Sequence, residues 1–242
     1  MNTRLLCCLL ALSPSTALAD DAHWGYQGEH GAEHWGELDP AFALCSTGRN
    51  QSPINIDRAL DAELPALQLD YSAASQQIVH NGHTVQINFA NGAVLQLDGQ
   101  PFALKQAHFH APSENTIEGK SFPLEAHFVH QSSDGQLAVI GLMFELGSDN
   151  PGLLAAWQGL PMKAGEQQTM TELPATQLLP SHRDYYRFNG SLTTPPCSEG
   201  VRWLLLKQAV SLSAAQLARF TDSIEGHNNR PVQALNARVV VE

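Results

Sequence analysis

Three histidines lie at spacings that would let them share one metal ion. His108 and His110 occur in the strand-like run Gln106 to His110, and on a strand residues i and i+2 project from the same face. A third histidine, His127, stands two residues after Glu125, and a neighbouring strand could bring it to the same place. Neutral imidazoles suit zinc, and three protein ligands leave a fourth position open for water, as catalytic sites do. The pattern therefore predicts a catalytic zinc site.

Polar residues beside two of these histidines would orient them. Gln106 and Glu125 each stand two positions before a histidine, on the same strand face, and could accept its remaining ring N–H. Two other interpretations stay open on these residues alone. The histidines could be ordinary surface or core residues with satisfied hydrogen bonds. Alternatively, His108, His110 and Glu114 fit the metal motif of the cupins, which bind iron or manganese, although that motif leaves Glu125 unused.

The segments that must position these side chains alternate or are continuously apolar in the manner of strands. They lie at residues 84–89, 93–97, 107–110, 124–130, 137–144 and 201–206. Helix signals are fewer. Ser213 and Gln216 form a capping-box pattern ahead of apolar residues at helical spacing, and Asn150 with Pro151 indicates the start of a second short helix. The sequence therefore predicts a β-rich chain whose strands mostly share one sheet.

The N-terminus has the features of a secretory signal peptide. Arg4 supplies positive charge, a short apolar run follows, and Ala17 to Ala19 form a small-x-small cleavage site. The apolar run is interrupted and too short to span a bilayer. We therefore expect residues 1–19 to be removed and residues 20–242 to form one catalytic domain. The product is expected to be exported, to a bacterial periplasm in the first instance, without membrane contact after cleavage.

Export would leave two of the four cysteines, Cys45 and Cys197, in an oxidising compartment. An even pair in such a compartment predicts a disulfide, with two buried thiols as the alternative. The loop that this bridge would close is long, so the chain-entropy model gives a stabilisation of roughly 4 to 5 kcal/mol.

The chain is strongly acidic. Its formal net charge is −11, and loss of Arg4 makes that of the mature chain −12, from 12 Lys and Arg against 24 Asp and Glu. This balance argues against nucleic acid as a partner. A homodimer is compatible with the sequence.

The same residues closely resemble the alpha-class carbonic anhydrases. The likeness covers essentially the whole mature chain and includes His23 to Tyr26, Gln51 to Ile56 and Asn228 to Pro231. Its most specific segments are Gln106 to His110, Glu125 to His127 and Ser191 to Pro196. The resemblance implies one domain of β-rich α+β class, with a central, mostly antiparallel twisted sheet of about ten strands and a few peripheral short helices.

The resemblance also implies an activity, the reversible hydration of carbon dioxide to bicarbonate and a proton by zinc-bound hydroxide. His108, His110 and His127 match the zinc ligands. Thr193 matches a gatekeeper threonine whose hydroxyl donates to Glu114 and accepts from the hydroxide. A non-catalytic binding domain of the same fold is the alternative, but such a domain would typically lack one or more of these histidines.

Further positions match the remaining parts of the family's site. His83 matches a histidine that relays protons, for which an imidazole is suited at neutral pH. Thr194 is expected to face bicarbonate, and the pair Cys45 and Cys197 falls where exported members carry a disulfide. The residues matching the water network are Tyr26, Asn81 and Gln86, and those matching the apolar wall for carbon dioxide are Val129, Val139, Leu192, Val201 and Trp203.

Overall fold

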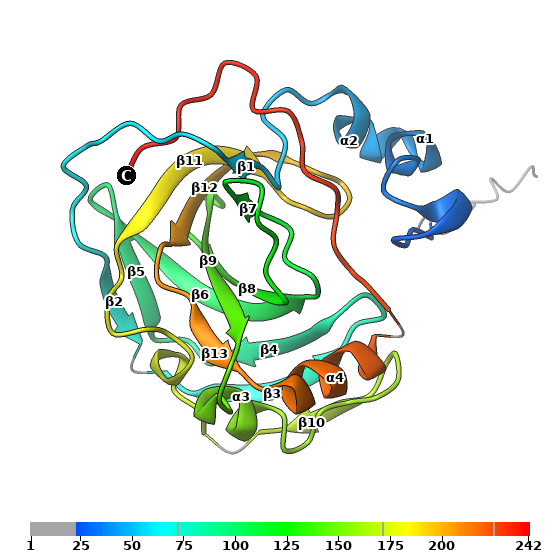
Figure 1. Cartoon of the computed structure of the whole chain (residues 1–242), viewed down its shortest axis with the longest axis vertical. Helices are drawn as coiled ribbons and strands as arrows, with labels where there is room; N and C mark the ends of the chain where they lie inside the picture. Colours follow the sequence, from blue (N-terminus) through cyan, green and yellow to red (C-terminus); the bar gives the residue numbers. More distant parts are fainter. Residues whose placement is uncertain (1–22, 72, 171, 225) are drawn as a thin grey trace, which may run out of the picture.

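The computed structural model describes residues 23–242 apart from residues 72, 171 and 225, so the expected signal peptide lies outside the described residues. Most of this part of the chain surrounds one large twisted sheet (Figure 1). The strands are β1 (Asn55–Ile56), β2 (Gln68–Tyr71), β3 (Ser75–His80), β4 (Val85–Phe89), β5 (Ala93–Leu97), β6 (Gln100–His110), β7 (Thr116–Ile117), β8 (Leu124–Gln131), β9 (Leu137–Leu146), β10 (Gln167–Thr169), β11 (Tyr185–Ser191), β12 (Glu199–Leu206) and β13 (Val210–Leu212). The helices are α1 (Trp35–Leu38), α2 (Leu44–Thr47), α3 (Pro151–Ala156) and α4 (Ala214–Ser223), with single 3₁₀ turns at Gly28–His30, Pro40–Phe42 and Ala175–Gln177.

The large sheet contains eleven of the described strands. Eight follow the order β10-β3-β4-β6-β8-β9-β12-β11, β5 joins β2 to β6, and β13 pairs with β9. Strands β12 and β13 run parallel to β9, and the other pairs in this sheet are antiparallel. The expected single domain with a mostly antiparallel sheet and few short helices is confirmed.

All six segments with strand patterns lie in strands, and the clearest difference concerns β6. Its expected span was 107–110, whereas the strand begins at Gln100. The register of β6 against β8 shifts between Leu104 and Gln106, which breaks the alternation of buried and exposed side chains. Strand β10 has no apolar pattern at all, because Gln167–Thr169 is exposed throughout.

Both expected helices begin at the predicted caps. The Ser213 hydroxyl accepts from the backbone N–H of Gln216, whose side chain accepts from the Ser213 N–H, a complete capping box. Asn150 caps α3 by accepting from the N–H of Leu153. Phe220 of α4 stacks on Trp157, with ring centroids 5.7 Å apart, and so joins this helix to the main core.

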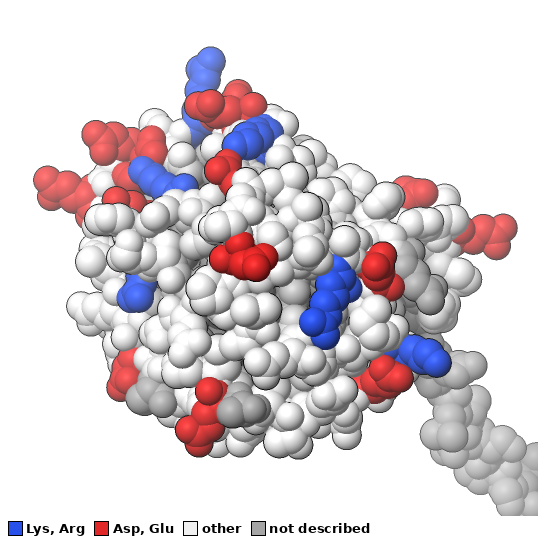
Figure 2. Space-filling model, turned by 60° about the horizontal axis from the view of Figure 1, so that its bottom comes forward, with Lys and Arg blue, Asp and Glu red and all other residues white. Residues whose placement is uncertain are grey.

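The sheet separates two apolar clusters. The larger one contains Phe109 and Phe128, which point away from the histidine-bearing face of β6 and β8. The smaller one contains Val139, Val201 and Trp203 on the side of the sheet that carries the histidines. No helix of the described chain is long and apolar enough to cross a membrane. Lys and Arg side chains stand apart from one another on the face in Figure 2, several beside an acidic group, so that face carries no continuous basic surface.

Candidate metal centre

The register of β4, β6 and β8 brings the three predicted histidines together. His108 pairs directly with His127 across β6 and β8, and His110 follows on the same face. Their ligand nitrogens all lie within 4.8 Å of one another. In the described part of the chain this is the one group of three or more such side chains that could hold a metal ion, and it does not include Glu114. The cupin interpretation, which uses Glu114 as a ligand, therefore has no geometric support.

Two of the rings are oriented by acceptors behind them. His108 Nδ1 lies 2.8 Å from Oε1 of Gln106, as the sequence predicted. His110 Nδ1 lies 2.7 Å from the carbonyl oxygen of Asn228, an acceptor that sequence reasoning missed. Each contact assigns the proton to Nδ1 and leaves Nε2 as the ring's free donor of a lone pair. The Nε2 atoms of both rings therefore face the shared space.

The third ring is held through its other nitrogen. His127 Nε2 lies 2.9 Å from Oε1 of Glu125, at ion-pair distance though without an aligned hydrogen bond. This contact leaves Nδ1 of His127 for a ligand. Burial lowers the pKa of His127, but the charge and contact of Glu125 and the charge of Glu114 outweigh it, so the net shift is upward. The ring is thus polarised by its carboxylate partner.

The buried nitrogens fit a zinc ion. His110 Nε2 is buried without a hydrogen-bond partner, and such an orphaned polar atom is unfavourable unless something fills the space in front of it. Burial, followed by the charge of His127, lowers the pKa of His108 to about 3, and burial lowers that of His110 as well. Both imidazoles are therefore neutral at pH 7, the form that binds zinc.

Glu125 is itself fixed by hydrogen bonds. Its Oε2 accepts from the backbone N–H groups of Glu114 and Asn115, and its Oε1 accepts from the Asn115 side chain at 2.8 Å. Gly141 on β9 lies opposite His127, and a Cβ added there would lie 2.6 Å from Leu205 Cδ1 and 3.2 Å from Glu125 Oε1. Asn115 escaped the sequence analysis because an amide after a turn carries no metal-binding signal.

Glu114 is fully buried next to the histidines. Its Oε2 lies 3.4 Å from His110 Nε2, and its Oε1 accepts from the backbone N–H of Arg230 at 2.8 Å. Burial raises the pKa of this carboxyl to about 7, against the charge of His127, the Arg230 N–H and the Thr193 hydroxyl, which lower it. Thr193 thus lies within electrostatic reach of Glu114, although no fully aligned hydrogen bond joins them in the described structure.

A hollow of about 140 Å³ opens in front of the histidines. It is lined by Trp24, Tyr26, Asn81, His83, Thr84, Gln86, Gln106, His108, His110 and Thr194. Asn81 Oδ1 accepts from the backbone N–H groups of His83 and Thr84, which forms the turn that presents the His83 ring. The structure therefore brings the predicted water-network residues, His83 and two of the three clustered histidines to one cavity.

The five predicted wall residues also lie together. All belong to the smaller apolar cluster, in which Val139, Val201 and Trp203 are buried while Val129 and Leu192 are partly exposed. Val139 pairs with Val129 on one side and Trp203 on the other. The Trp203 ring meets the His127 ring edge to face, with centroids 4.8 Å apart. An apolar surface therefore adjoins the histidine cluster.

A larger hollow lies elsewhere and carries no comparable chemistry. It measures about 540 Å³ and is lined by parts of segments 61–67 and 181–185 with Lys207 and Glu242. Lys207 and Glu242 pair with each other at 2.7 Å. Size alone would select this hollow, but the convergent buried imidazoles are in the smaller one, and we assign the site there.

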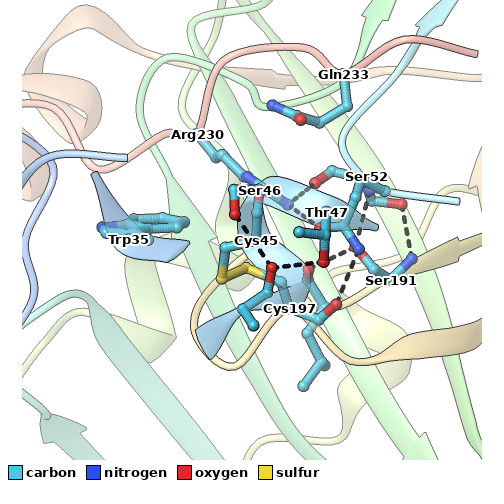
Figure 3. Close-up of a disulfide and its surroundings, with 12 residues drawn as sticks. Trp35, Cys45, Ser46, Thr47, Ser52, Ser191, Cys197, Arg230 and Gln233 are labelled. Carbon is cyan, nitrogen blue, oxygen red and sulfur yellow. Dashed lines mark hydrogen bonds between the residues drawn. A yellow bond between two sulfur atoms is a disulfide. The ribbon is translucent and has the colours of Figure 1, made fainter. Parts of the chain in front are cut away.

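The predicted disulfide between Cys45 and Cys197 is present, with its cysteines 152 residues apart in sequence (Figure 3). It joins α2 to the loop that carries Thr193 and Thr194. Both cysteines are buried and pack against Trp35 in a small cluster. The alternative of two buried thiols is excluded in this structure.

Comparison with known proteins gives a consistent result. A family model described as eukaryotic-type carbonic anhydrase matches residues 30–242. A carbonic anhydrase of Pectobacterium atrosepticum is 50% identical over 234 residues, covering 96% of each chain, and one of Neisseria gonorrhoeae is 46% identical over 97% of this chain and 94% of its own. The alpha-carbonic anhydrase of Thermovibrio ammonificans, solved with the inhibitor sulfanilamide, superposes with a TM-score of 0.89 at 46% identity, covering 91% of this chain and 99% of its own.

Proposed function

This chain belongs to the eukaryotic-type, or alpha, carbonic anhydrase family of lyases, and from that premise we propose how its own residues hydrate carbon dioxide. His108, His110 and His127 hold a zinc ion in this proposal. The observation that carries it is the convergence of three imidazoles, two buried and that of His108 partly buried, whose other nitrogens already have partners. Zinc bound to three histidines supplies a nucleophile at neutral pH, since in enzymes of this family it lowers the pKa of a coordinated water to about 7.

The three acceptors behind the histidines set the affinity for the metal. Gln106, the Asn228 carbonyl and Glu125 each fix one ring and so reduce the entropy lost on binding. Two of the acceptors are neutral and one is a carboxylate. The protein thus neutralises only part of the charge of a divalent cation, which leaves the centre electrophilic.

Thr193 orients the nucleophile through Glu114. When Glu114 is ionised its carboxylate can only accept, so in this proposal the Thr193 hydroxyl donates to it and keeps its oxygen lone pairs for the nucleophile. A nucleophile that donates a hydrogen bond to the Thr193 oxygen is then held in one orientation. A metal ligand that has no proton to donate faces the lone pairs of this oxygen instead, so its binding is disfavoured.

His83 relays the proton released in each cycle. Its ring lines the same hollow as His108 and His110, so ordered water could join them across the cavity. Tyr26, Asn81 and Gln86 contribute polar groups to that lining. An imidazole is suited to this exchange with buffer because its ordinary pKa lies near 6.5.

Carbon dioxide is small and apolar, and the wall of the smaller cluster supplies a weak site for it. Val129 and Leu192 are the partly exposed members of this wall, beside the buried Val139, Val201 and Trp203. Thr194, which also lines the hollow, is placed to donate to the bicarbonate product.

The test is carbon dioxide hydration measured by stopped flow, before and after zinc is removed with a chelator and again after zinc is restored. Rapid hydration that disappears and returns with zinc supports the proposal, whereas a folded, zinc-loaded and inactive protein would favour the non-catalytic binding domain. His127→Ala should lower zinc affinity and activity together. His182→Ala, which removes an exposed histidine outside the cluster, is the matched control and should change neither.

We further propose that the mature chain begins near residue 20 and acts in the periplasm. The signal-like N-terminus supports this, and so does the disulfide, which persists in oxidising compartments. N-terminal sequencing of the protein from a periplasmic fraction should find Asp20 or a neighbour first. Recovery of the intact N-terminus in the cytoplasm alone would contradict export.

A further inference from the structure

Arg230 is a buried cation for which the described chain provides no ion-pair partner. Its side chain is 1% exposed, yet its guanidinium makes hydrogen bonds only to neutral acceptors. Burying a charge this way is unfavourable by several kcal/mol unless its hydrogen bonds are well satisfied. Its Nε is buried without a hydrogen-bond partner, so the three hydrogen bonds satisfy only part of the guanidinium.

The fork reaches three acceptors from two segments, α2 and the segment at residues 51–52. Nη1 donates to Oε1 of Gln51 and to the carbonyl oxygen of Ser52, and Nη2 donates to the carbonyl oxygen of Cys45, each at 2.8 Å. Figure 3 shows the Arg230 side chain pointing between Ser52 and the disulfide, with Trp35 beside it. The guanidinium carbon lies 5.7 Å from the Trp35 ring centroid.

Each of the three acceptor residues is also bonded to the 191–197 loop, which carries Thr193. Ser52 and Ser191 exchange two hydrogen bonds, from the Ser52 N–H to the Ser191 hydroxyl and from the Ser191 N–H to the Ser52 hydroxyl. Ser191 is the residue where the loop begins. Arg230 thus holds the first end of the loop through Ser52.

The second end of the loop is held twice. Gln51 Nε2 donates to the carbonyl oxygen of Cys197 at 3.0 Å, and Cys45 is joined to Cys197 by the disulfide. Two glycines leave the space these links need. A Cβ added at Gly48 would lie 2.3 Å from Gln51 Nε2, and one at Gly190 would lie 2.1 Å from the Ser52 hydroxyl.

Arg230 also contacts Glu114, the proposed partner of Thr193. The backbone N–H of Arg230 donates to Glu114 Oε1, so one residue contacts Glu114 directly and both ends of the 191–197 loop indirectly. We propose that Arg230 is a positioning residue whose guanidinium fork sets the Thr193 hydroxyl in register with Glu114. This inference rests on the proposed function, because it assigns a purpose to the Thr193 and Glu114 pair.

The positioning role of Arg230 depends on the geometry of its guanidinium donors rather than on its charge. A lysine would keep a positive charge but could not donate to all three acceptors with fixed geometry. Misplacement of a catalytic group by about 1 Å can lower a rate about 100-fold. We therefore expect Arg230→Met and Arg230→Lys both to lower kcat/KM by about 10- to 100-fold, since the backbone N–H to Glu114 remains in each.

The test is a double-mutant cycle on the zinc-loaded, disulfide-bonded protein, combining Arg230→Met with Thr193→Ala. If Arg230 acts through Thr193, its loss should change kcat/KM by no more than about twofold once Thr193 is absent. An equal loss in both backgrounds would overturn the proposal, as would full activity of Arg230→Lys. Gln51→Met, which removes one acceptor of the Arg230 fork and one link to Cys197 but keeps the guanidinium, is a milder variant should Arg230→Met fail to fold.

Hydrogen exchange in the zinc-free protein supplies a second readout. Arg230→Met and Gln51→Met should speed exchange of the loop amides of Leu192 and Cys197, which bond within the loop region, without a matching change in β8. Uniformly faster exchange would indicate a general loss of stability and overturn the positioning role. Because this measurement needs no metal, it still decides the role of Arg230 if the zinc-loaded wild-type protein fails to hydrate carbon dioxide.

Discussion

The imidazole of His83 lies flat against the indole of Trp24, with ring centroids 3.6 Å apart and planes inclined by 7°. Trp24 is held in turn by Trp35, which it meets edge to face at 5.2 Å. Burial is the largest of the effects that lower the pKa of His83, followed by the charges of His23 and His80. The stack therefore connects the N-terminal segment to the proposed proton relay.

Replacing His83 should separate proton transfer from metal binding. In His83→Ala we expect zinc to remain bound, because the ring is not among the three that converge on the metal position. Turnover in weak buffer should fall about 100-fold, at the lower end of the usual contribution of general acid–base catalysis. Added imidazole should restore it, as measured by stopped flow. Unchanged turnover in weak buffer would remove His83 from the relay.

Removing the stacked indole should raise the pKa of His83. Trp24→Ala uncovers one face of the ring and relieves the burial that lowers this pKa, so the value should move toward that of an ordinary histidine. An NMR titration of the His83 ring would measure the shift. His23→Gln is the control for the charge effect and should give a smaller rise. If Trp24→Ala leaves the pKa unchanged, burial by the indole is not its cause.

Loss of the disulfide should destabilise the fold without dismantling the metal site. The bridge closes a loop of 152 residues, for which the chain-entropy model gives about 4 to 5 kcal/mol as an upper figure. We expect Cys45→Ser to have a free energy of unfolding, measured by urea titration, that is lower than that of the wild type by up to this amount. Its zinc content should equal that of the wild type. Reduction of the disulfide in the wild-type protein should lower its free energy of unfolding by the same amount. An equal unfolding midpoint for variant and wild type under oxidising conditions would contradict the prediction.

A buried histidine outside the site should make stability depend on pH. His130 is fully buried, and its Nε2 lies 2.5 Å from the Tyr71 hydroxyl. Burial lowers the pKa of His130 to about 4. Between this value and the ordinary one near 6.5, the unfolded chain takes up a proton that the folded chain excludes, so stability falls as pH falls through that window. The loss should reach about 3 kcal/mol.

The measurement is urea unfolding of metal-free protein at pH 7.5 and pH 4, compared with His130→Gln. The variant keeps an acceptor for the Tyr71 hydroxyl but has no group that titrates there. Its stability should therefore fall less between the two pH values. Other titrating groups, including His108 and His110, contribute to both proteins and cancel in the difference. Equal losses would show that His130 does not contribute to acid destabilisation.

Local patterns predicted those parts of the molecule that depend on neighbours in sequence. The i, i+2 spacing of His108 and His110 set their common face, and the capping box at Ser213 set the start of α4. Strand β10 and the early part of β6 lacked such patterns, because one is wholly exposed and the other contains a register shift. Their pairing depends on partners elsewhere in the chain, which no local pattern encodes.

The sequence alone determined which side chains are candidate metal ligands and that a cysteine pair is present, because residue type and strand period are local properties. Only the tertiary structure decided which nitrogen of each ring is free. His110 is oriented by a backbone carbonyl 118 residues away, at Asn228, and a carbonyl gives no signal in the sequence. The contact of Trp24 with His83 and the hydrogen bonds from the Arg230 guanidinium to residues 45, 51 and 52 likewise arise only when distant parts of the chain pack together.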